Sequence, residues 1–212
     1  MLKEIHEQPE ALRRCISGRL DKGNGSARLG GLKLEPVRLR NAPLVRLIGC
    51  GTALNACTIG QLAIEGLARI PAIAHISSEF RYNEHVINPN AIHFAVSQSG
   101  ETADTLSAVK EIQLKGGEVH GIINVVGSTI ARLCGQGVYI HSGPEQAVAS
   151  TKAFTNMVAS LLLFAIRIGR TRSFSRERGR SIIENFEEIP KLMESYLSNP
   201  GPIDEAVELL KD

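Results

Sequence analysis

Residues 92–115 read IHFAVSQSGETADTLSAVKEIQLK, and this stretch joins an apolar run, a hydroxyl-rich loop and an amphipathic segment. The run Ile92–Ser97 is short and continuous, which is typical of a parallel strand covered on both faces. Apolar residues then recur at helical spacing over Ala103–Lys115. A buried strand that leads directly into a helix predicts part of a βαβ unit.

The same alternation continues on both sides of this stretch, from Pro43 onward. Short apolar runs predict five parallel strands, at Leu44–Gly49, Ala72–Ile76, Ile92–Ser97, Val119–Asn124 and Gly137–His141. Longer amphipathic segments predict helices at Ala53–Ala68, Ala103–Lys115, Ser128–Leu133 and Val148–Ile168. We therefore expect a three-layer α/β/α domain with a five-stranded parallel sheet, of the flavodoxin-like class, over residues 43–170.

Helical segments flank this domain. Residues 1–42 predict a leading helix over Glu4–Ser17 and then a long mobile loop, because glycines interrupt the pattern from Gly18 to Gly31. Residues 171–212 predict a helix near Glu177–Leu197, a Pro/Gly breaker and a last helix over Ile203–Leu210. Six arginines between positions 167 and 180 favour a solvated helix junction over a nucleic-acid site, since the chain as a whole has a net charge of only +2.

Composition narrows the class of partner and compartment. The 24 basic and 22 acidic side chains give a net charge of +2, which predicts no steering toward nucleic acid or an anionic membrane. The longest apolar run, Met157–Ile166, is too short to span a bilayer. Four cysteines without CxxC spacing indicate a reduced, cytoplasmic setting, and six histidines without ligand spacing indicate no metal site.

Ligands of open parallel sheets bind where the loops leave the carboxyl ends of the strands. The first such loop, residues 49–53, has glycines that suit a close backbone approach, but Leu54 stands where a dinucleotide fingerprint needs a third glycine. The second strand ends in Ile76 and Ser77 rather than in an acidic residue. Nicotinamide or flavin binding is therefore disfavoured, and no cofactor is expected. Cys50 in this loop is interpreted as a small buried residue.

The loop Ser97–Thr102 carries the sharper signal. Its hydroxyls and flexible glycine precede a helix whose first amides lack partners and carry partial positive charge, so a phosphate can bind without lysine or arginine. The alternative is that Ser97 and Thr102 only cap the helix. The loop over residues 143–152 again places small residues and hydroxyls before a helix and could form another wall of the same pocket. Its Lys152 is interpreted first as a surface lysine.

Several segments together resemble the sugar isomerase (SIS) domain of glutamine–fructose-6-phosphate aminotransferases, the enzymes that make glucosamine 6-phosphate. The segments are Lys3–Pro9, Cys50–Thr52, Ser78–Tyr82, Ser97–Thr105 and Val148–Phe154. The resemblance covers nearly the whole chain in order. It implies that Ser97, Gln98, Ser99 and Thr102 hold a sugar phosphate. It also implies that Thr52 and the backbone around Val148 lie near the sugar.

The chain also departs from this family. Ala53 stands where the family often has serine, so a contact to the ligand would be lost. The family enzymes carry a glutaminase domain and two SIS lobes, and the resemblance covers the first lobe. In the family, the glutamate, lysine and histidine that move protons and open the sugar ring come from the second lobe. No catalytic residue is therefore assigned in this chain.

Three hypotheses follow for its role. The leading one is a first SIS lobe that binds fructose 6-phosphate or glucosamine 6-phosphate without completing the reaction alone. The second is an active isomerase or aminotransferase, formed on assembly with a second lobe. The third is a sugar-phosphate sensor that contacts a partner through the arginines of residues 167–180. Because SIS lobes normally pack in pairs, we expect a homodimer, or a partnership with a separate second lobe or glutaminase domain.

Overall fold

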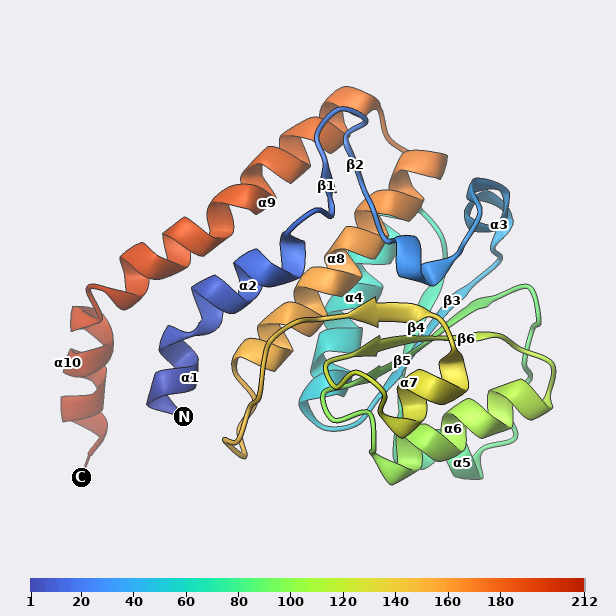
Figure 1. The fold of residues 1–212 in the computed structure, drawn as a ribbon, viewed down its shortest axis with the longest axis horizontal. Coiled ribbons are helices and arrows are strands. Elements are labelled where there is room, and N and C mark those ends of the chain that lie inside the picture. Colours follow the sequence, from blue (N-terminus) through green and yellow to red (C-terminus); the bar gives the residue numbers. More distant parts are fainter. Residues whose placement is uncertain (212) are drawn as a thin grey trace.

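The computed structural model describes residues 1–211 and is built around a five-stranded parallel sheet (Figure 1). The strands are β3 (Val45–Gly49), β4 (Ala72–Ile76), β5 (Ile92–Ser97), β6 (Val119–Ile123) and β7 (Gly137–Tyr139). Their order in the sheet is β4-β3-β5-β6-β7. The predicted α/β class with five parallel strands is confirmed, and each strand end lies within two residues of its expected position.

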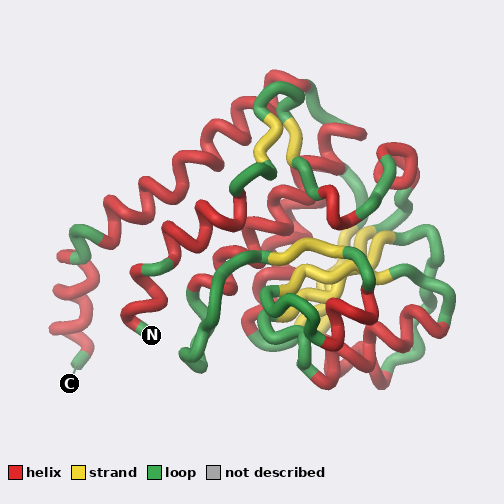
Figure 2. The backbone as a smooth tube through the Cα atoms, in the orientation of Figure 1, coloured by secondary structure: helices red, strands yellow, loops and turns green. Residues whose placement is uncertain are grey.

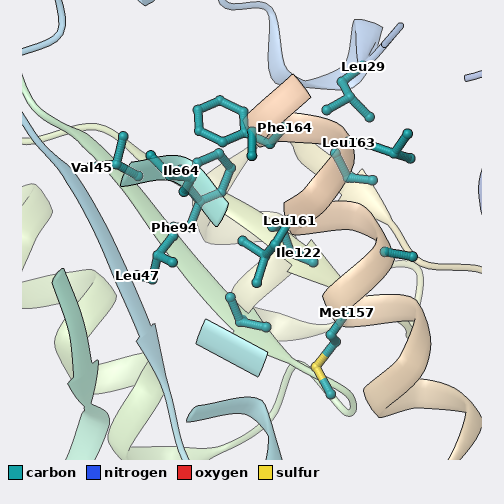
Figure 3. Close-up of a cluster of buried hydrophobic side chains, with 14 of the residues drawn as sticks. Leu29, Val45, Leu47, Ile64, Phe94, Ile122, Met157, Leu161, Leu163 and Phe164 are labelled. Atoms are coloured by element: carbon teal, nitrogen blue, oxygen red, sulfur yellow. The ribbon is translucent and has the colours of Figure 1, made fainter. Parts of the chain in front are cut away.

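Helices cover both faces of the sheet because alternate residues of each buried strand point to opposite sides. On one face, Leu47 and Phe94 pack against α4 (Thr52–Ala68) and α8 (Lys152–Arg172), in the cluster drawn in Figure 3. The rings of Phe94 and Phe164 meet edge to face, with centroids 4.7 Å apart. On the other face, Ile48 and Ala95 pack with α5 (Ser77–Tyr82), α6 (Ala103–Leu114) and α7 (Thr129–Cys134).

Helix α8 is long and apolar enough to pass a length-and-composition test for a membrane span. However, 72% of its apolar window is buried inside the fold. Its side chains Leu161, Phe164 and Ile168 have no exposed surface and belong to the main core cluster. Helix α8 is therefore the central helix of the packed layer.

The N-terminal region differs from the expected single helix and mobile loop. The leading helix is divided into α1 (Leu2–His6) and α2 (Gln8–Ile16), with Pro9 in the first turn of α2. The glycine-rich segment forms a hairpin of β1 (Leu20–Asp21) and β2 (Ser26–Ala27), a 3₁₀ turn at Gly30–Leu32 and α3 (Pro36–Asn41). Its apolar residues Leu29, Leu32, Leu34 and Leu39 are buried in the main core, and this burial holds the segment in place.

The C-terminal helices are α9 (Arg176–Leu197) and α10 (Gly201–Leu210), which extend as an arm beside α2 (Figures 1 and 2). The arginines of residues 167–180 are mostly exposed, as expected for a solvated junction, and they also bind other parts of the chain. Five of them donate to backbone carbonyls, mostly in the N-terminal segment: Arg167, Arg170, Arg172, Arg176 and Arg180. These guanidinium groups tie the N-terminal hairpin and α3 to α8 and α9. The division of the chain at residues 42 and 170 stays a prediction.

One buried side chain links α8 to α2 and to the residue that follows β7. The Asn156 side-chain amide, on α8, donates to the carbonyls of Ala11 and Ile140, both at 2.9 Å. Asn156 has no exposed surface. We expect Asn156→Ala to lower the free energy of unfolding by about 2 kcal/mol, because two buried carbonyls lose their donor. Urea denaturation measures this change, and Asn55→Ala, at an exposed position of α4, is the matched control. Equal stability of the two variants would contradict the prediction.

Candidate functional site

A cavity of about 190 Å³ lies at the carboxyl ends of β3 and β5. The chain runs from β3 to β4 on one side and then crosses to β5 on the other, so the strand order reverses between β3 and β5. Such a reversal leaves a crevice above the sheet, where ligands of open α/β folds bind. All six predicted site residues line this cavity: Thr52, Ser97, Gln98, Ser99, Thr102 and Val148. Three separate chain segments are thus brought to one place.

The first wall is the loop from β5 into α6. The hydroxyl of Ser97 accepts a hydrogen bond from the Gly100 amide at 3.0 Å and lies 3.1 Å from the hydroxyl of Thr102. Gly100 has a φ of +67°, a conformation that favours glycine. Helix α6 begins after Thr102, whose side chain makes no capping hydrogen bond. Thr102 is therefore not held as a cap, and the first amides of α6 have no partner within the helix.

The acidic residue in this loop is directed away from the cavity. The Glu101 carboxylate accepts a hydrogen bond from the Thr129 amide at 2.8 Å, at the start of α7. This backbone hydrogen bond holds the pKa of Glu101 below its ordinary value. Glu101 is not among the cavity-lining residues. The Glu101 carboxylate is thereby held at the start of α7, away from a phosphate bound in the cavity.

The second wall is the turn from β3 into α4. Gly51 has φ +56° and ψ −130°, which allows a sharp turn directly before Thr52, and a Cβ at Gly51 would meet only open space. Ala53 lines the cavity with a methyl group at the position where the resemblance leads one to expect a hydroxyl. Cys50, predicted to be buried, is only partly buried and also lines the cavity. The turn therefore presents one hydroxyl, one thiol and one methyl group.

The third wall is the loop that precedes α8. The Glu145 carboxylate accepts hydrogen bonds from the Ser150 hydroxyl and the Thr151 amide, both at 2.9 Å, and from the Ala153 amide at 3.2 Å. Glu145 and Ser150 line the cavity, and sequence reasoning did not select either as a site residue. No local sequence pattern marks Glu145 as a site residue. Its hydrogen bonds hold this loop against the start of α8.

Helix starts are the source of positive potential at the cavity, and Glu145 is the one charged side chain among the described residues that line it. No lysine or arginine is among the described residues that line it. Lys152, predicted to be a surface lysine, is only 4% exposed, and its ammonium group forms an ion pair with Glu7. The hydrogen bond that the Lys152 ammonium donates to the Glu7 carboxylate lowers the pKa of Glu7. Over residues 1–211, no cluster of three or more histidine, cysteine, aspartate or glutamate side chains could hold a metal.

The comparison with known protein families identifies the family to which this fold belongs. Residues 38–167 match the SIS domain family. The chain belongs to the SIS domain family. Among curated relatives, this SIS domain is 41% identical over 211 residues to the glutamine–fructose-6-phosphate aminotransferase (isomerizing) of Symbiobacterium thermophilum. It is 42% identical over 212 residues to the enzyme of the same name from Chlorobaculum tepidum.

This SIS domain spans about a third of the length of those relatives, 35% of the first and 34% of the second, while 99% and 100% of its own length is matched. Among solved structures, the C-terminal domain of glucosamine-fructose-6-phosphate aminotransferase from Francisella tularensis superimposes with a TM-score of 0.91 and 31% identity. That match covers all of this chain and 59% of the other. The SIS domain is thus homologous to the isomerase part of these aminotransferases.

Proposed function

We propose that this SIS domain binds the phosphate of a hexose phosphate, fructose 6-phosphate or glucosamine 6-phosphate, in the cavity between β3 and β5. The observation that carries the proposal is the convergence of Thr52, Ser97, Gln98, Ser99 and Thr102 on one cavity without a cation. Hydroxyls and unpaired amides at helix starts are sufficient for a phosphate. The relatedness to aminotransferases whose names include fructose 6-phosphate supports the same ligand class.

We further propose that the domain acts as the first SIS lobe of an aminotransferase of this kind and does not complete the reaction alone. Isomerisation of a ketose phosphate needs a base near the carbons that exchange the proton. Of the described residues around the cavity, Glu145 supplies the one carboxylate, and its oxygens already accept hydrogen bonds from Ser150, Thr151 and Ala153. The proposed role of this chain is therefore to hold the substrate by its phosphate.

Ligand-induced thermal stabilisation tests the binding. A ligand at one hundred times its Kd stabilises the folded state by about 2.7 kcal/mol, so millimolar fructose 6-phosphate and glucosamine 6-phosphate should raise the Tm. Fructose without phosphate should leave the Tm unchanged. Ser97→Ala should abolish most of the shift, because the Ser97 hydroxyl organises the phosphate loop. Absence of stabilisation by both phosphorylated sugars would overturn the proposal.

Turnover separates this role from the second candidate, an enzyme that is active on assembly with another lobe. The purified chain with fructose 6-phosphate and ammonia should form no glucosamine 6-phosphate although binding is intact. Product formation by the chain alone would favour the second candidate. The sensor hypothesis stays a weaker candidate, because five of the arginines in question also donate to carbonyls of the chain itself.

The arm formed by α9 and α10 supports the proposal of a partner lobe or a second copy. Apolar side chains on it are exposed, and they are Leu192, Tyr196, Ile203, Val207, Leu209 and Leu210. Burying such a surface against another lobe would stabilise an assembly. Light scattering after size-exclusion chromatography gives the oligomeric state of the chain.

A further inference from the structure

The N-terminal helix α1 lies against the loop that precedes α8, although the two are far apart in the sequence (Figure 1). The Glu4 carboxylate accepts hydrogen bonds from the amides of Gln146 at 2.7 Å and Ala147 at 3.2 Å. Ala147 and the adjacent Val148 line the candidate sugar-phosphate cavity. One turn of helix thus holds the backbone of one cavity wall.

The geometry of Glu4 is specific. Its carboxylate is buried, with the whole residue only 8% exposed, and each oxygen accepts one backbone amide. The hydrogen bond from Gln146 is the main reason that the pKa of Glu4 lies below its ordinary value. The Glu4 carboxylate also lies 3.8 Å from the Met1 amino group. Because this ion pair is long and the amino group is exposed, it contributes little to the orientation of Glu4. Glu4 is therefore oriented toward the loop.

The loop has little other support at this point. A cavity of about 400 Å³ lies between the N-terminal helices and the loop, and its lining includes Glu4, Glu7, Gln146 and Lys152. Val148 is fully exposed, so no apolar packing of its side chain fixes it. A second contact closes the same junction, since Glu7 pairs with Lys152 at the start of α8. The position of residues 146–148 thus depends on hydrogen bonds to α1 and on Glu145.

We propose that Glu4 is a positioning residue for sugar-phosphate binding: it holds the backbone of residues 146–148 in place at the wall of the cavity. This proposal rests on the proposed function of that cavity. If the backbone of this wall is already ordered in the free protein, ligand binding loses less conformational entropy. The phosphate loop Ser97–Thr102 belongs to β5 and α6, so Glu4 acts on the sugar side of the site and leaves the phosphate side unchanged.

The test compares Glu4→Ala and Glu4→Gln with Glu10→Gln, a control on α2 that lines the same 400 Å³ cavity and is exposed. Calorimetry gives the Kd for fructose 6-phosphate and for inorganic phosphate. We expect Glu4→Ala to weaken fructose 6-phosphate binding about tenfold and to leave phosphate binding unchanged. Glu4→Gln keeps one acceptor oxygen and should lie between wild type and Glu4→Ala. Glu10→Gln should bind both ligands like wild type.

Hydrogen exchange provides a readout that does not depend on ligand. The amides of Gln146 and Ala147 should exchange faster in Glu4→Ala, while those of the β5–α6 loop should not change. Unchanged fructose 6-phosphate affinity in Glu4→Ala, or an equal loss for sugar phosphate and inorganic phosphate, would overturn the proposal. If wild type itself binds neither ligand, the proposed function fails, and amide exchange still decides whether Glu4 positions the loop.

Discussion

Gly100→Ala is expected to lower the free energy of unfolding by about 3 kcal/mol and to abolish stabilisation by sugar phosphates. A Cβ at position 100 would lie 2.0 Å from the Ser128 hydroxyl oxygen and 2.9 Å from a methyl group of Ile123. Gly100 also has a φ of +67°, which is unfavourable for alanine. The loop would have to move off Ser128, and the Ser97 hydroxyl would lose the Gly100 amide. Denaturant titration and thermal shift with fructose 6-phosphate measure the two effects.

Gly66→Ala is the matched control for this prediction. Gly66 is an exposed residue of α4, and a Cβ there would meet no atom within 4 Å. Alanine at such a helical position should stabilise the protein by about 0.5–1 kcal/mol and leave ligand binding intact. If Gly100→Ala retained wild-type stability and ligand response, the close contact between the phosphate loop and Ser128 would be refuted.

Acidification from about pH 7.5 to about pH 5 is expected to destabilise the fold by about 2 kcal/mol for each of His93 and His120. Burial lowers the pKa of both side chains from 6.5 to about 4. Above pH 6.5 these histidines are neutral in the folded and unfolded chain alike. Between pH 6.5 and about pH 4, the histidines of the unfolded chain bind protons that those of the folded chain do not. The free energy of unfolding therefore decreases as the pH decreases.

Urea denaturation across this pH range measures the loss. His120→Leu removes one titrating group from the core and should reduce the pH dependence. The carboxylates whose pKa values are lowered, such as Glu4 and Glu101, lose their contribution below pH 4.5 and do not affect this window. A stability that stayed constant down to pH 5 would show that both histidines are solvated.

Helix α8 shows which features a local sequence pattern can predict and which it cannot. Apolar periodicity correctly predicted a long helix there, but its start was predicted at Val148 and lies at Lys152. Glu145 accepts the amides of Thr151 and Ala153, so residues 148–151 form a loop that closes on the helix start. The glycine-rich segment was predicted as a mobile loop because its own residues show no periodic pattern. The arginines that hold it in place come from α8 and α9, which are distant in the sequence.

The sequence by itself determined the parallel sheet and the phosphate-site hypothesis at the loop Ser97–Thr102, whereas Thr52 and Val148 were added by the resemblance to the SIS family. Strands buried on both faces must be continuously apolar, and a hydroxyl-rich loop before a helix is a local pattern, so both features can be read from neighbouring residues. Tertiary structure decided the burial of Lys152, the exposure of Cys50 at the cavity and the contact of Glu4 with residues 146 and 147. These depend on segments that meet only after folding, and no local periodicity encodes which distant backbone amides a carboxylate will accept.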